Sequence, residues 1–247
     1  SAYQKTLKLA IEIADTSKMA LAYNNIGEVN LEQNNPARAL ENLTLAYELA
    51  QRNNIPSILV AINNSLGDTY FRLDSTQKAI DYFEHALEFA KRQDNARATC
   101  KALIGLAKVR NRAGLLKEGL ANGLEALQKA EDMGQVQLKR DANEIVSTIY
   151  EAMGDGNNAI KYFRKYKIYS DSLLSLESER AAATYKANYE FSKKELEFER
   201  KTLQQRWVIF SAFAALFSLA VILFIINRNR KRLSVTYRAL QQKNSII

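Results

Sequence analysis

The sequence predicts an all-α protein, in which a solenoid of helical hairpins is followed by a long helix and one transmembrane helix. Three observations support this prediction. First, a long repeat, seen for example in Gly27 and Gly67, runs through most of the chain. Second, no proline or glycine occurs from Asn157 to Trp207. Third, the segment 207–226 is uncharged and mostly apolar. Each observation predicts one part of the architecture.

The repeat is visible as several series of residues spaced by 40. One series is Gly27, Gly67, Ala107 and Ser147, a second is Ala39, Ala79, Gly119 and Ala159, and a third is Leu43, Phe83, Gly123 and Phe163. Small residues of the first two series would let helices approach closely, with a bulky residue filling the space beside them. Such a pattern indicates a repeat array, which buries its core between neighbouring units.

Each unit is predicted to contain two helices with a short break between them. In the second unit, Leu66, Tyr70 and Leu73 mark one apolar face, and a second apolar face begins at Ala79 after the break at 74–75. In the first unit the break contains Asn35 and Pro36. Asn is a favoured N-cap, and Pro is favoured at the first helical position because its missing N–H costs nothing there.

This arrangement resembles the tetratricopeptide repeat. The second unit carries the pattern best, with Leu66-Gly67, Tyr70, Ala79, Phe83 and Ala86; the first follows it with Ile26-Gly27, Ala39 and Ala46, and the third and fourth are degenerate. The unit in this chain is longer than the usual unit of about 34 residues, and a HEAT-type hairpin has a similar length but lacks this register. The resemblance implies four repeats at 20–171, preceded at 1–19 by the second helix of a truncated repeat.

Residues 172–206 are predicted to form a continuous stalk helix. Its 3–4 alternation is typical of a two-stranded coiled coil and comprises Ala182, Tyr185, Tyr189, Ser192, Leu196, Glu199 and Leu203. We therefore expect a homodimer through the stalk, although Ser192 and Glu199 weaken the seam. The alternatives are a solvated single helix and a helix packed back on the array.

Residues 207–226 are long enough to form a single-pass membrane span of roughly 30 Å. A core helix is the alternative, but it would need a much larger domain around it. The net charge of +8 is concentrated in residues 173–247, where it suits a lipid bilayer better than nucleic acid, which we do not expect to bind. The residues expected to flank the membrane are Arg206, Trp207, Arg228, Arg230, Lys231 and Arg232.

The cations after the span outnumber those immediately before it, although the bias is modest over a wider window. The positive side of a span is normally cytoplasmic, so we expect an extracytoplasmic (periplasmic) array and a cytoplasmic basic helix at 227–247. This orientation requires a signal sequence upstream, and both ends of the chain are expected to be cut within a longer protein.

The residues predict no catalytic site, metal site or cofactor in this stretch. The only cysteine, Cys100, and the only histidine, His85, are expected to be packing or surface residues. The resemblance implies instead a peptide- or protein-binding concave groove, lined by Asn24, Glu28, Asn64, Asp68, Arg72, Lys101, Lys108, Arg112, Glu144 and Thr148. Asn24 and Asn64 could form a ladder that holds an extended peptide backbone. The alternative is that these are ordinary solvated residues.

The order of repeats, span and coiled coil is similar to the input half of bacterial membrane signal transducers. That similarity implies a ligand- or protein-binding sensor, whose missing output domain would most often be a histidine kinase, and sometimes a nucleotide cyclase or a DNA-binding domain. A membrane-anchored scaffold for protein–protein assembly is the alternative function.

Overall fold

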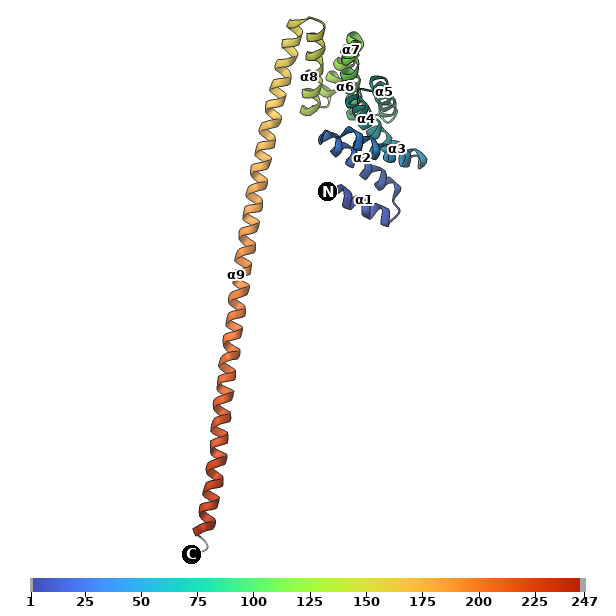
Figure 1. The fold of residues 1–247 in the computed structure, drawn as a ribbon. Coiled ribbons are helices and arrows are strands. Elements are labelled where there is room, and N and C mark those ends of the chain that lie inside the picture. Colours follow the sequence, from blue (N-terminus) through green and yellow to red (C-terminus); the bar gives the residue numbers. More distant parts are fainter. Residues whose placement is uncertain (1, 245–247) are drawn as a thin grey trace. The chain divides into compact units, whose positions relative to one another are not determined.

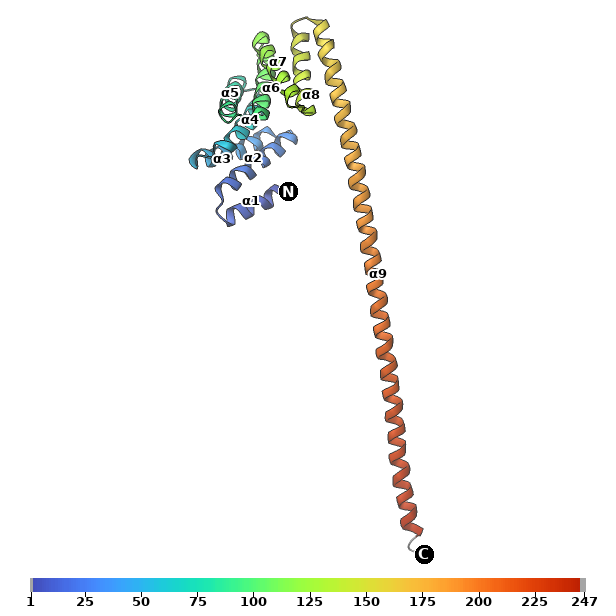
Figure 2. The same ribbon diagram turned by 180° about the vertical axis from the view of Figure 1, so that it is seen from behind.

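The computed structural model describes residues 2–244, and it describes the side chains of residues 3–214, 216–231 and 233–235 within them. The described chain is α-helical (Figures 1 and 2). Its helices are α1 (Ala2–Glu12), α2 (Thr16–Glu32), α3 (Pro36–Arg52), α4 (Pro56–Arg72), α5 (Thr76–Arg92), α6 (Ala96–Arg112), α7 (Leu116–Asp132), α8 (Val136–Ala152) and α9 (Gly156–Asn244). The chain divides into two units, Ser1–Glu177 and Ser178–Ile247. The all-α prediction is confirmed.

Helices of equal length alternate with tight corners in the first unit. Each helix from α2 to α8 has 17 residues, and the helices begin at even intervals along the chain. A residue of positive φ stands at every corner, namely Ala14, Asn34, Asn54, Asp74, Asp94, Gly114, Gly134 and Gly154. At most corners the following residue donates its N–H to a carbonyl five positions back, as from Asn35 to Asn30 (2.8 Å). This left-handed C-terminal motif ends most of the helices from α1 to α8.

Side chains at the helix starts reinforce these boundaries. Asn35 accepts a hydrogen bond from the backbone N–H of Arg38, and Pro36 occupies the first position of α3, so both predictions for this break are confirmed. Asp15 caps α2 in the same way by accepting from Lys18 (2.9 Å). The first helix of repeat one therefore begins at Thr16, upstream of the boundary expected at 20.

The core of the array consists of large side chains packed against glycines. Phe83 on α5 is only 2% exposed, and its ring lies against Gly67 of its own hairpin and Gly105 of the next one. In repeat one, Leu43 packs against Gly27 in the same manner. The predicted pairing of small and large residues is thus present. Gly105, however, does not belong to either of the series of small residues from which this pairing was predicted.

The last residue of the series of large residues has a different environment. Phe163, at the position equivalent to Phe83, is 54% exposed, and its neighbour Ile160 is 56% exposed. Within the described residues of the first unit, no further helical hairpin follows α9 to cover this face. The repeat pattern therefore gives the position of Phe163 but does not give its burial.

The contacts between helices define the curvature of the array. The first helices of successive hairpins contact one another, as α2 with α4, α4 with α6 and α6 with α8, whereas the described parts of α3, α5 and α7 make no such contacts with one another. Helices that touch on one side and spread on the other produce a curved solenoid. The concave surface is accordingly lined by α2, α4, α6 and α8.

The second unit comprises the residues of α9 from Ser178 onward. Among the described residues, α9 alone is long and apolar enough to cross a membrane, judged by length and composition. None of that apolar stretch is buried, and Trp207 and Phe217, for example, are 70% and 72% exposed. The predicted long C-terminal helix is confirmed.

Candidate functional site

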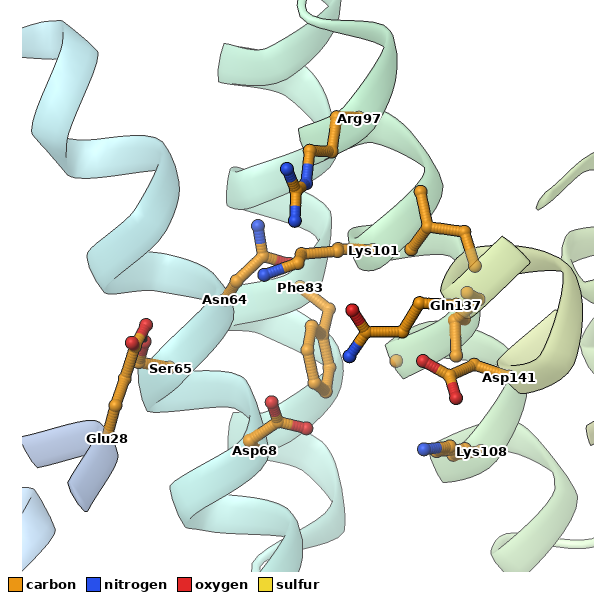
Figure 3. A pocket seen from close by; sticks show the side chains of 13 residues that line it. Glu28, Asn64, Ser65, Asp68, Phe83, Arg97, Lys101, Lys108, Gln137 and Asp141 are labelled. Carbon is orange, nitrogen blue, oxygen red and sulfur yellow. Dashed lines mark hydrogen bonds between the residues drawn. The ribbon is translucent and has the colours of Figure 1, made fainter. Parts of the chain in front are cut away.

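A cavity of about 240 Å³ opens on the concave surface (Figure 3). Its polar lining comes mainly from α4, α6 and α8, with Glu28 contributed by α2. The ring of Phe83 and the backbone at Gly105 form part of the same lining. The packing of α5 against α6 therefore also shapes the cavity.

Three cations on α6 face this cavity. Arg97, Lys101 and Lys108 follow one another at helical spacings of four and seven, which place side chains on one face of a helix. None of the three forms an ion pair within 4.0 Å among the described residues. Figure 3 shows Lys101 extending from α6 toward Asn64 on α4. The cations are thus available to an anionic ligand.

The carboxylates around the cavity have different interaction partners. Asp141 on α8 is paired with Arg140 at 2.5 Å. Glu28 accepts hydrogen bonds from Ser65 Oγ (3.0 Å) and Asn24 Nδ2 (3.3 Å), which links α2 to α4. Neither bond involves a cation of α6. The acidic side chains therefore leave the three cations uncompensated at contact distance.

Asp68 on α4 also lines the cavity. The surrounding protein raises the pKa of its carboxyl group, because partial desolvation outweighs the attraction of Lys108, Arg72 and Lys101. Water still reaches the exposed side chain, so solvent screens these interactions and their energies are small. Asp68 is accordingly an accessible acceptor beside the cations.

Asn64 provides a buried acceptor at the cavity wall. Its side chain is 8% exposed, and its Nδ2 donates to the carbonyl of Val60 at 3.1 Å. Its Oδ1 is buried and has no hydrogen-bond partner among the described residues. A buried carbonyl oxygen without a donor carries an energetic penalty.

Five residues predicted for the groove line this cavity: Glu28, Asn64, Asp68, Lys101 and Lys108. Asn24 is 2% exposed and supports Glu28 from behind the wall, so only one member of the predicted Asn ladder reaches the cavity. Glu144 and Thr148 are exposed on α8 and do not line it.

Arg72 and Arg112 have structural contacts away from the cavity. Arg72 donates to the carbonyl of Leu31 (3.0 Å), and Arg112 donates to the carbonyl of Phe71 (2.7 Å), each at the C-terminal end of the equivalent helix one repeat earlier. Arg112 also pairs with Asp74 (2.8 Å) and lies over the Phe71 ring. These arginines join successive repeats.

Sequence reasoning missed part of the lining, namely Ser65, Phe83, Arg97, Ile104, Gly105, Gln137, Leu138 and Asp141. Arg97 precedes Lys101 by one helical turn, so the same helix face could have indicated it. The α8 residues carried no comparable signal. Within the part of the chain that the structure describes, no group of three His, Cys, Asp or Glu could hold a metal ion.

The expected membrane-flanking residues lie on α9 at both ends of the apolar stretch. Arg206 and Trp207 precede it and are exposed, and Trp207 packs edge-on against Phe210 with 6.2 Å between the ring centroids. Arg228, Arg230 and Lys231 follow it and are exposed. The side chain of Arg232 lies outside the described residues.

Residues 57–132, which contain the hairpins α4–α5 and α6–α7, match the tetratricopeptide repeat family. No curated protein sequence matches the chain. The family match covers these two hairpins, and the helical-hairpin fold of the first unit is similar to that of tetratricopeptide-repeat arrays, which generally form non-catalytic surfaces for binding proteins or peptides.

Three solved structures illustrate the similarity. BtubC from P. vanneervenii has 18% identity and a TM-score of 0.60, with 69% of this chain and 71% of that chain covered. A Rap protein complexed with Competence and Sporulation Factor has 16% identity, coverage of 64% and 43%, and a TM-score of 0.55. A signal transduction ATPase with a tetratricopeptide repeat sensor from Pyrococcus horikoshii has 17% identity, coverage of 73% and 28%, and a TM-score of 0.57. At these identities the similarity shows the fold alone.

Proposed function

We propose that this chain is the ligand-binding input region of a single-span membrane signal transducer, and that its ligand is an extended peptide bearing a carboxylate. The observation that carries the proposal is the row of Arg97, Lys101 and Lys108, which faces the cavity without ion-pair partners among the described residues. A carboxylate would supply the charge-assisted hydrogen bonds that these donors lack.

The opposite wall supports an extended backbone as the rest of the ligand. Asn64 Oδ1 is a buried acceptor without a donor among the described residues, and Asp68 is an accessible acceptor. A peptide N–H can bond to the accessible carboxylate of Asp68, while the peptide's acidic side chain or C-terminal carboxylate contacts α6. The Rap protein complexed with Competence and Sporulation Factor and the ATPase described as having a repeat sensor are consistent with a sensing role.

The exposed apolar stretch of α9 supports a membrane tether. An apolar helix segment that nothing else in the described chain buries suits the hydrocarbon core of a bilayer, and Arg206, Arg228 and Arg230 suit its surfaces. The proposed orientation places the repeats outside the cytoplasm. Ligand binding would favour one of two states of the array, and a homodimeric stalk would transmit the change to a cytoplasmic output, most often a histidine kinase in the similar transducers.

A binding measurement on the full chain in detergent micelles tests the ligand class. The probe is a set of extended heptapeptides that carry Asp or Glu, with matched peptides carrying Asn or Gln and an amidated C-terminus. We expect preferential binding of the acidic set, and a loss of at least about tenfold in the Lys101→Ala/Lys108→Ala variant.

The matched control is Lys5→Ala/Lys117→Ala, which removes two exposed cations that do not line the cavity. This control separates a local effect from a general loss of positive charge. Equal binding of acidic and neutral peptides, or an equal loss in both variants, would refute the carboxylate site.

A one-residue insertion after Leu203 tests transmission. The insertion turns the downstream helix by about 100° relative to the upstream helix. A transducer should lose its response while peptide binding is retained, whereas a membrane-anchored scaffold should keep its assemblies. A retained response would therefore favour the scaffold.

A further inference from the structure

Large apolar side chains recur at every seventh position along one face of α9. The series, which we name the heptad column, is Tyr189, Leu196, Leu203, Phe210, Phe217 and Phe224. Every member is exposed, with exposed fractions from 54% at Leu203 to 72% at Phe217. An apolar heptad repeat is the spacing with which two helices maintain contact over many turns.

The phenylalanines of the apolar stretch are confined to this face. Phe213 stands at the next seam position after Phe210 in the same heptad pattern, and no phenylalanine of 207–226 lies elsewhere. Contact with lipid requires only apolar side chains and imposes no heptad period. Apart from Trp207, Ser211 and Ser218, the remaining positions are Val, Ile, Leu and Ala, which satisfy lipid contact.

We infer that two copies of this chain pair in parallel along the heptad column, so that the contact continues from the stalk into the membrane as layers of phenylalanine. The inference rests on the proposed function only in that residues 207–226 lie in a bilayer. Insertion of both copies in one orientation makes the pair parallel. Facing phenylalanine rings contribute attraction beyond the burial of their area.

Charges beside the column favour a second copy in parallel over an antiparallel partner. Lys186, Lys193 and Arg200 occupy one edge of the seam at the same heptad spacing. In an antiparallel pair this cationic edge would face itself, and like charges would repel. In a parallel pair it faces the opposite edge, where Glu195 of one copy comes beside Arg200 of the other.

The second seam positions show where the pairing is strong. Ser192, Glu199 and Arg206 occupy this series in the stalk, whereas Phe213 and Ala220 occupy it in the span. Polar or like-charged layers weaken the contact before the membrane, and apolar layers strengthen it inside. The span is therefore the stronger part of the dimer contact.

Disulfide cross-linking of the full chain in membranes tests the contact surface. Cys100 is first replaced by Ala, the residue found at the equivalent position two repeats earlier, Ala20. Leu196→Cys and Leu203→Cys then place single thiols on the column, and Lys194→Cys and Lys201→Cys place them on the opposite face of the same turns. We expect covalent dimers from the first two variants at least about tenfold more abundant than from the others. Equal yields on both faces, or no dimers at all, would overturn the inference.

A dissociation measurement in detergent micelles tests the part of the contact in the span. The triple variant Phe210→Leu/Phe217→Leu/Phe224→Leu keeps the stretch apolar but removes the rings, and its dimer Kd should rise at least about tenfold. Val208→Leu/Ile222→Leu changes the opposite face and should leave the Kd unchanged. An unchanged Kd in the triple variant would place the contact elsewhere. Peptide binding measured in the same samples distinguishes failure of the proposed ligand site from failure of this contact.

Discussion

Replacing Gly105 by Ala should destabilise the array, although the same change in a helix interior is ordinarily favourable. A Cβ at Gly105 would lie 2.5 Å from Cζ of Phe83, and one at Gly67 would lie 2.8 Å from other ring carbons. The ring is held between the two glycines and can withdraw only toward the cavity that it lines. Overpacking of this kind costs about 1–3 kcal/mol, and removing a helical glycine returns about 1 kcal/mol. We expect a net loss of about 1 kcal/mol, and at most about 2 kcal/mol.

Gly119→Ala is the matched control because it makes the same chemical change in a helix interior. A Cβ there comes no closer than 3.3 Å to other atoms, and the equivalent positions 39 and 79 are already fully buried alanines. This variant should be between neutral and about 1 kcal/mol more stable than the wild type. The two variants should therefore differ by about 2 kcal/mol.

Cys100 allows this difference to be measured in the full chain. The thiol lies on α6 with Gly105, is fully buried, and is the only cysteine of the sequence. Pulsed thiol labelling across a urea series reports the free energy of opening this part of the array. In a Phe83→Leu background the cost of Gly105→Ala should shrink, since the ring is gone. If Gly105→Ala proves as stable as Gly119→Ala, the packing argument is wrong.

Three further predictions concern the repeat junctions and the titrating groups. Arg112→Ala should cost about 1–2 kcal/mol in the same labelling assay, because it removes the bond to the Phe71 carbonyl and the Asp74 ion pair, yet it should leave peptide binding unchanged. Burial raises the pKa of the Cys100 thiol to about 11, so the folded state keeps the thiol proton at a pH where the unfolded state loses it. Between pH 9 and 11 the free energy of unfolding of the wild type should therefore fall by up to about 2–3 kcal/mol relative to that of Cys100→Ala, measured by urea unfolding followed by circular dichroism. A difference between the two proteins that stays constant with pH would contradict this. Because desolvation raises the pKa of Asp68, the wild type should be less stable than Asp68→Asn at neutral pH. The difference in the free energy of unfolding between the two proteins should shrink as the pH is lowered toward 3, and a difference that grew would contradict the direction of the pKa shift.

The sequence predicted the hairpins because close packing requires small residues at fixed intervals, and Gly27 and Gly67 are visible without coordinates. The resemblance to the tetratricopeptide repeat implied that Lys101 and Lys108 line the groove, and both residues line the cavity. The contribution of α8 was not predictable in the same way. Gln137 and Asp141 approach the cavity through the curvature of the array, which depends on how each hairpin rotates against the next. Likewise, Arg72 and Arg112 occupy groove-like sequence positions, but the carbonyl ends of earlier helices bind them.

The corners at Asn34, Asn54, Gly114 and Gly134 share one backbone conformation, and the helices between such corners are equal in length. This regularity determines which duplications or deletions the gene for this array could tolerate. Gain or loss of a complete hairpin preserves every junction between first helices. Gain or loss of a single helix with its corner also preserves the corners, but it places a helix of the convex row in the concave row, where its side chains do not fit. Viable length variants of this array should therefore differ by whole hairpins.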